Sequence, residues 1–262
     1  MRRALPAVAV FVATFVALAF LALPVVAIFA RVSPRRLIAQ LGNPVVTDAL
    51  LVSLQTTLVA QALILALGTP AAYVLATRRF RGRGLAVTLV ELPLVLPPAV
   101  AGIGLLAAFG RAGLLHTSIP FTQAAVVLAV AFVASPLYVR AAIAAFEGVD
   151  GNVVAASRTL GAGPVRTFFR VVLPLARGGL VAGAALAFAR GLGEFGATIM
   201  FAGSLRGVTQ TLPLAVYSQF DVNFDVALAV SALLVLISAA LLVTLKWLPS
   251  ASTSRFRFAT SS

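Results

Sequence analysis

The chain has 262 residues, of which 61% are hydrophobic and 10% charged, and its mean hydropathy is +1.08. These values exclude the class of water-soluble globular proteins. The chain holds no Cys and one His, which excludes disulfide frameworks, thiolate metal sites and catalytic cysteines, and we expect no metal site. The net charge of +13 does not indicate a nucleic-acid partner, because the arginines stand between apolar runs rather than on one soluble face.

Six apolar stretches are long enough to cross a membrane, for which a helix needs about 20 mostly apolar residues. They lie at about 5–30, 49–76, 86–109, 123–146, 180–202 and 226–248. The first stretch could instead be a cleaved signal peptide, but it is about twice as long as a typical signal core. The sequence thus predicts an all-α integral membrane protein with one transmembrane domain, 1–248. A short tail, 249–262, rich in Ser and Arg, would follow on the cytoplasmic side and could contact anionic lipid.

The basic residues set the direction of the spans, because Lys and Arg are retained on the cytoplasmic side of a membrane. With the N-terminus inside, the inside segments hold fourteen of the 20 basic residues and the outside loops hold five, while Arg190 lies within a span. We therefore expect both termini in the cytoplasm.

The third span contains Pro93, Pro97 and Pro98, each of which removes a backbone donor and clashes with the preceding turn. We expect this span to kink or break. Unpaired backbone at membrane depth is tolerated against protein or a water-filled cavity, so the break indicates a translocation path. A structural kink packed inside the bundle is the alternative. Gly102 and Gly104 would let another backbone approach closely.

The fifth span carries Arg190 and Glu194, which are four residues apart and can form an ion pair. A carboxylate at this depth costs at least about 2.5 kcal/mol unless it is paired or hydrated. A carboxylate facing an oxyanion would repel it, so we expect Glu194 to position Arg190 or to brace a gate. A purely structural pair is the alternative. The single His116 lies in a short outside loop without a second ligand nearby.

The longest inside segment, 147–179, has the pattern of two short helices. Asp150 can cap the first helix and Gly161 can end it, while Pro164 can begin the second and Pro174 can stop it. The segment is either an amphipathic loop lying on lipid headgroups or a helical knob that docks into a groove of a soluble partner.

Three motifs in this segment and in the third and fifth spans are similar to those of a known family. They are Ala155-Ala156-Ser157-Arg158-Thr159-Leu160-Gly161-Ala162 with Leu173-Pro174, Leu92-Pro93-Leu94-Val95-Leu96-Pro97-Pro98, and Gly193-Glu194-Phe195-Gly196. Together they resemble the molybdate, tungstate and sulfate permeases of type I ABC importers, with molybdate favoured. The first motif departs from the family, because Val154 and Ala155 stand where Glu is expected. Glu147 or Asp150, just upstream, could substitute.

The resemblance implies a homodimeric permease in a prokaryotic cell membrane that works by alternating access, with a cytoplasmic dimer of ATPase subunits and an extracytoplasmic oxyanion-binding protein as partners. The path or gate would include Pro97, Pro98, Gly102, Arg190, Glu194 and Phe195. Coupling to the ATPase would involve Val154, Ala155, Ala156, Ser157, Leu160, Gly161, Ala162 and Pro174. The outside loop 203–225, with Arg206, Asp221 and Asp225, would receive the binding protein.

The chain itself has no Gly-x-x-x-x-Gly-Lys-Ser/Thr loop and a single Lys, so we expect it to bind no cofactor and its partner to use the ATP. An ion-driven secondary transporter is the alternative mechanism. It is disfavoured because Glu91 and Glu194 are the only acids within the spans and no inverted repeat is visible. An intramembrane enzyme is disfavoured because no Ser/His or paired-Asp arrangement lies in the spans, and no catalytic residue is predicted.

Overall fold

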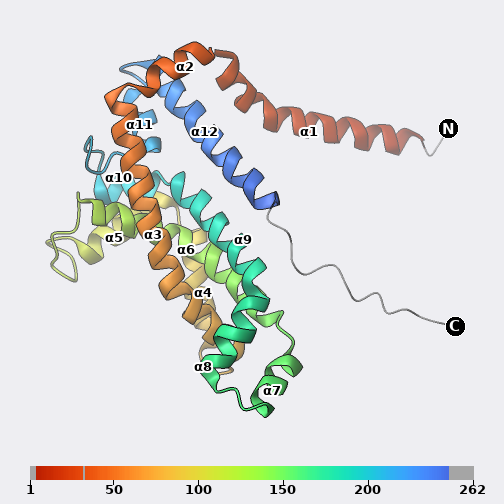
Figure 1. The fold of residues 1–262 in the computed structure, drawn as a ribbon. Helices are drawn as coiled ribbons and strands as arrows, with labels where there is room; N and C mark the ends of the chain where they lie inside the picture. Colours follow the sequence, from red (N-terminus) through yellow and green to blue (C-terminus); the bar gives the residue numbers. More distant parts are fainter. Residues whose placement is uncertain (1–3, 32, 248–262) are drawn as a thin grey trace.

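The computed structural model describes residues 4–31 and 33–247, and the regular elements in these ranges are all helices. The predicted tail, 249–262, lies outside the described residues. Figure 1 shows the arrangement. The elements are α1 (Ala4–Arg31), α2 (Pro34–Leu41), α3 (Pro44–Thr77), α4 (Arg83–Val95), α5 (Pro98–Phe109), α6 (Gln123–Glu147), α7 (Gly151–Thr159), α8 (Pro164–Thr167), the π-helix η1 (Phe168–Val172), α9 (Leu173–Leu192), α10 (Gly196–Ala202), α11 (Leu212–Gln219) and α12 (Phe224–Trp247).

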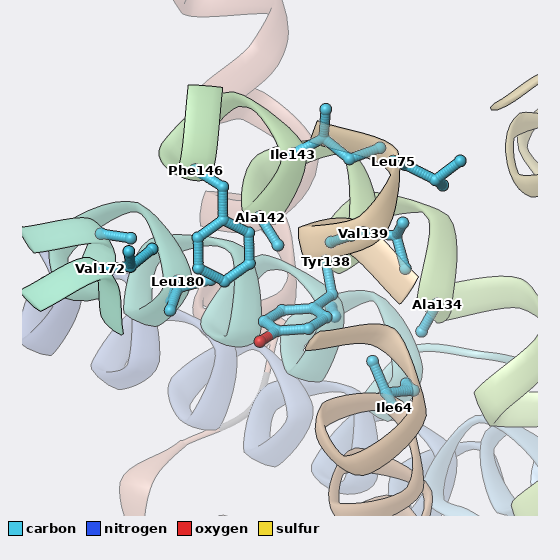
Figure 2. Packing of buried hydrophobic residues seen from close by; sticks show 13 residues of the cluster. Ile64, Leu75, Ala134, Tyr138, Val139, Ala142, Ile143, Phe146, Val172 and Leu180 are labelled. Carbon is cyan, nitrogen blue, oxygen red and sulfur yellow. The ribbon is translucent and has the colours of Figure 1, made fainter. Parts of the chain in front are cut away.

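Helices α3, α6 and α9 form the centre of the bundle, and α6 packs against both of the others (Figure 1). Small residues let the helices approach closely: a Cβ added to Gly183 would lie 2.6 Å from the Cβ of Ala141. Tyr138 of α6 lies inside this core (Figure 2), and its hydroxyl is 2.6 Å from that of Thr69 on α3. The polar tip of a buried tyrosine is thus satisfied by the neighbouring helix.

In the described ranges, the predicted spans are present as five helices of sufficient length and apolarity and one bent pair. The bent pair is α4 and α5, whose axes differ by 117° across the break before Pro98. The broken third span predicted from its prolines is therefore confirmed. The second span begins five residues earlier than predicted, because Asn43 caps α3 by accepting the N–H of Val45 at 3.0 Å.

The fifth span differs from the prediction at both ends. Its helical run extends from Pro164 to Leu192, so Pro174 does not stop the helix as we expected. The π-helix η1 explains this, because the N–H of Leu173 bonds to the carbonyl of Phe168, five residues back. The wider turn accommodates the proline ring and its missing N–H. At the other end the run stops at Leu192, and α10 is a separate helix.

Helices α1 and α12 lie at the outside of the bundle and differ in how much of the chain they contact. Helix α12 contacts α11, α1, α2 and α9, whereas most of α1, which precedes α2, projects away from the body of the bundle (Figure 1). The most apolar window of α1 is 0% buried within this chain. Its apolar side chains therefore require a surrounding other than this chain, either lipid or another protein.

Candidate functional site

The glycines and prolines of the third and fifth spans meet where α5 crosses α10, and we call this contact the α5–α10 crossing. A Cβ added to Gly102 would lie 2.6 Å from the carbonyl oxygen of Ala197 and 2.7 Å from the Cβ of Met200. A Cβ added to Gly196 would lie 2.6 Å from the Cβ of Pro98. The close approach predicted at Gly102 is confirmed. The one predicted at Gly104 is not made within the described part of this chain, because none of its atoms lies within 4 Å of a Cβ placed there.

Glu194 holds the turn between α9 and α10. Its side chain is 1% exposed. Oε1 accepts the N–H of Ala197 at 2.8 Å, and Oε2 pairs with Nη1 of Arg190 at 2.7 Å. The carboxylate thus satisfies an amide in the first turn of α10 and neutralises an arginine in the last turn of α9. Both oxygens are therefore engaged within this chain.

Arg190 is the cation of this pair and is more accessible than its partner. Its side chain is 35% exposed. A guanidinium has five N–H donors, and Glu194 engages the Nη1 nitrogen. Arg190 therefore keeps donors and exposed surface for a further contact.

Phe195 lies in the turn after Glu194, and its ring centroid is 5.3 Å from that of Tyr217 on α11. Both rings line an apolar cavity of about 430 Å³ between α1, α11 and α12. The gate residues predicted from the sequence are thus split between two places. Gly102, Pro98, Arg190 and Glu194 belong to the α5–α10 crossing and the adjoining turn, whereas Phe195 faces α11. Pro97 is the exposed residue before α5.

Ser53 is a structural residue of this region that the sequence analysis missed. Its Oγ accepts the N–H of Leu212 at 2.7 Å, which links α3 to the start of α11. Ser53 is 1% exposed. A buried serine in an apolar span is a signal for such an interhelical bond, but it does not reveal the partner 159 positions away.

The predicted pair of short helices is present as α7 and α8 with the turn between them, and we call residues 150–167 the α7–α8 knob. Oδ1 of Asp150 accepts the N–H of Asn152 at 2.8 Å, so the predicted cap is confirmed. Gly161 has φ of +84°, and Ala162 N–H donates to the carbonyl of Ser157 at 3.0 Å. This is a Schellman ending, and the helix end predicted at Gly161 is confirmed.

Phe168, the first residue of η1, follows the knob directly and joins it to the bundle by aromatic packing, so we call it the base of the knob. The ring of Phe168 lies 4.8 Å from that of Tyr73 on α3 and 6.2 Å from that of Phe146 on α6. The Oγ atoms of Ser157 and Thr167 are 3.2 Å apart and tie α7 to α8. The base of the knob therefore contacts two of the central helices, so a displacement of the knob would be felt by α3 and α6.

The tip of the knob exposes apolar residues. Leu160 is 89% exposed and Val165 is 71% exposed, and Ala155 and Ala156 of the predicted coupling motif are also exposed. Val154 is half-buried and packs toward the central core. Pro174 lies in the first turn of α9 rather than in the knob. The knob thus has an exposed, apolar tip.

The two acids that could replace the missing Glu are engaged elsewhere. Oε1 of Glu147 pairs with Nη2 of Arg83 at 2.8 Å, and Asp150 caps α7. Neither carboxylate is placed as a substitute at Val154 or Ala155. The suggestion that one of them substitutes is therefore not supported.

The outside loop predicted at 203–225 contains α11. Nε of Arg206 pairs with Oδ2 of Asp48 at 3.0 Å. Asp221 and Asp225 are exposed, and Asp225 lies in the first turn of α12.

His116 lies on another loop with φ of +48°. Across residues 4–31 and 33–247, no group of three His, Asp or Glu side chains could hold a metal ion.

Comparison with known proteins gives both sequence and structural relatives. Residues 64–257 match the family of binding-protein-dependent transport system inner membrane components. ModB of Mycobacterium tuberculosis, a molybdenum transport system permease protein, is 47% identical over 88% of this chain and 90% of the relative. WtpB of Pyrococcus abyssi, a molybdate/tungstate transport system permease protein, is 33% identical over 87% of this chain and 90% of the relative.

Among solved structures, the fold is similar to that of a bacterial ABC transporter involved in the import of the acidic polysaccharide alginate. The TM-score is 0.70 and the identity 13%, over 97% of this chain and 98% of that chain. At this identity the likeness concerns the fold alone.

Proposed function

The chain belongs to the family of binding-protein-dependent transport system inner membrane components, and we propose that it is the membrane-spanning subunit of an ABC importer that carries molybdate into the cytoplasm. The predicted resemblance to oxyanion permeases is confirmed by the relatives from Mycobacterium and Pyrococcus. The substrate proposal rests on the Mycobacterium relative, whose likeness spans about nine-tenths of both chains. Tungstate is the second candidate, because the Pyrococcus relative is named for both anions.

In this proposal the α5–α10 crossing is part of the gate, and the observation that carries it is the Glu194–Arg190 pair at the break between α9 and α10. The buried carboxylate fixes the orientation of Arg190, and the exposed part of the guanidinium supplies N–H donors to a passing oxyanion. Arginine suits tetrahedral oxyanions because its planar fork matches their oxygens. Since Glu194 neutralises Arg190, a passing anion is held by the remaining N–H donors and not by a net positive charge, which keeps its binding weak.

The pairing of the intramembrane acids favours an ATP-driven importer over an ion-driven transporter. Glu194 pairs with Arg190 at 2.7 Å, and Glu91 pairs with Arg140 at 3.2 Å. A carboxylate that couples transport to protons or sodium must exchange its cation during each cycle. Two acids that are each held by an arginine are poorly suited to that task.

The α7–α8 knob transmits the work of a separate ATPase dimer. Its exposed apolar tip offers a surface for the groove of that partner, and its aromatic base passes the motion to α3 and α6. ATP is bound and hydrolysed by the ATPase subunits, while this chain binds no cofactor.

Two further partners complete the importer. A second copy of the chain covers the apolar surface of α1, which is unburied in a single copy. An extracytoplasmic oxyanion-binding protein docks on the loop 203–225, where Asp221 and Asp225 are exposed and Arg206 pairs with Asp48.

Competition between anions tests the substrate. Cells that lack other molybdate importers and express this chain with its ATPase and binding protein should accumulate labelled molybdate. We expect a tenfold excess of tungstate to compete and the same excess of sulfate to leave uptake unchanged. Uptake that sulfate suppresses more strongly than tungstate would assign the chain to sulfate instead.

A further inference from the structure

The end of the bundle that carries the α7–α8 knob has more arginines than its acids can neutralise. Its three acids are all engaged, Glu91 with Arg140, Glu147 with Arg83 and Asp150 with the amide of Asn152. Seven exposed arginines remain at this end of the part of the chain that the structure describes, and no carboxylate of that part pairs with them. They are Arg78, Arg79, Arg81, Arg158, Arg166, Arg170 and Arg177.

Two of these arginines face a common cleft. Arg78, just after α3, and Arg158 on α7 line a cavity of about 650 Å³ together with Tyr73 and Phe168. The same two arginines and Tyr73 also line an adjoining cavity of about 470 Å³ beneath α7. We call the two cavities together the Arg78–Arg158 cleft. The one acid on its walls, Glu147, is already held by Arg83 at 2.8 Å.

We propose that the Arg78–Arg158 cleft receives an Asp or Glu side chain of the ATPase subunit. This inference rests on the proposed function, since it concerns the chemistry by which the same knob is gripped. The family resemblance expects an acid in the knob at Val154 or Ala155, where this chain is apolar. The charges left for a partner here are therefore all positive, and a carboxylate is the complement that two guanidinium groups require.

The position of the cleft favours a protein ligand over a lipid headgroup. The knob projects beyond the ends of the central helices (Figure 1), and the cleft is lined by the exposed apolar side chain of Val165 and by Phe169. Apolar side chains beside paired cations are the features of a protein interface with a charged anchor. An anionic phospholipid is the competing ligand, and the experiment separates the two.

Carbodiimide crosslinking tests the proposal, because the reagent activates a carboxylate and a lysine amine then attacks it to form an amide. The chain has one native lysine, Lys246, so an introduced lysine is easily distinguished. The variants are Arg78→Lys and Arg158→Lys. The matched control is Arg79→Lys, because Arg79 is exposed but does not line the cleft. Each is assembled with the ATPase subunit in nanodiscs of phosphatidylcholine, which carries no carboxylate.

We expect mass spectrometry to find the lysines introduced at positions 78 and 158 joined to an Asp or Glu of the ATPase subunit at least tenfold more often than the control lysine at position 79. Equal crosslinking at all three positions, or none at 78 and 158 in an intact complex, would overturn the proposal. If the unaltered permease did not bind the ATPase subunit at all, the proposed function would fail instead.

Affinity supplies the second measurement. The double variant Arg78→Gln, Arg158→Gln should bind the ATPase subunit about tenfold more weakly in phosphatidylcholine nanodiscs, and its binding should respond less to salt. A loss that appears only when phosphatidylglycerol is included would identify a lipid headgroup as the ligand and refute the proposal.

Discussion

Replacing Gly102 by Ala should push the α5–α10 crossing apart. The added methyl group would lie 2.6 Å from the carbonyl oxygen of Ala197, whereas ordinary contact begins at 3.4 Å, so the helices must separate by about 0.8 Å. Two of the three nearest atoms belong to the backbone of α10, which cannot rotate away as a flexible side chain could. Overpacking of this kind costs about 1–3 kcal/mol.

The strain should appear in transport, because a gate must adopt two arrangements. If the strain destabilises only one of these arrangements, the equilibrium constant between the two changes by a factor of about 5 to 150. We expect initial rates of molybdate uptake to fall at least fivefold at equal amounts of permease in the membrane. Gly104→Ala on the same helix is the control, because no atom lies within 4 Å of its Cβ position. Equal uptake by the two variants would refute the role given to the crossing.

Three further predictions concern the residues that hold the site. Glu194→Gln should lower uptake while membrane insertion stays normal. The double variant in which Arg190 and Glu194 are exchanged should also have low uptake, because a carboxylate at position 190 cannot cap α10. Full uptake by this double variant would show that the pair has a purely structural role. Gly161→Ala should uncouple ATP hydrolysis from uptake, since φ of +84° costs an alanine about 1 kcal/mol. The control Gly163→Ala, at φ of −67°, should couple hydrolysis to uptake normally. Identical ATPase activity and uptake in the two variants would contradict the role given to Gly161. Ser53→Ala leaves the first amide of α11 unpaired and should lower the free energy of unfolding by about 1–3 kcal/mol, and an unchanged denaturation midpoint in detergent would argue against the bond.

The spans were predictable because a helix must have a minimum length of apolar residues to cross a membrane. Runs of about 20 apolar residues predicted the long helices, and three prolines within six positions predicted the break at which α4 and α5 are bent by 117°. The α7 cap at Asp150 and the left-handed Gly161 were predictable because both are local backbone requirements. These features depend on residues that are close together in the sequence.

The sequence-based predictions failed where the structure depends on contacts between distant residues or on an unusual helix geometry. Pro174 indicates a helix end, but the π-helix before it lets the helix continue. Helix α11 forms in a segment that looked like a loop, and Ser53 from α3 satisfies its first amide. The contact of Gly102 with Ala197 joins positions 95 residues apart. Periodicity along one segment carries no information about which segment of the chain it will meet.

The most direct test of the proposed function is uptake by the purified importer in sealed vesicles. The permease, the ATPase subunit and the binding protein would be reconstituted with ATP on the side of the α7–α8 knob and labelled molybdate with the binding protein on the other. We predict accumulation that requires ATP and persists after ionophores have collapsed the proton and sodium gradients. Accumulation driven by an ion gradient without ATP would contradict the proposed function.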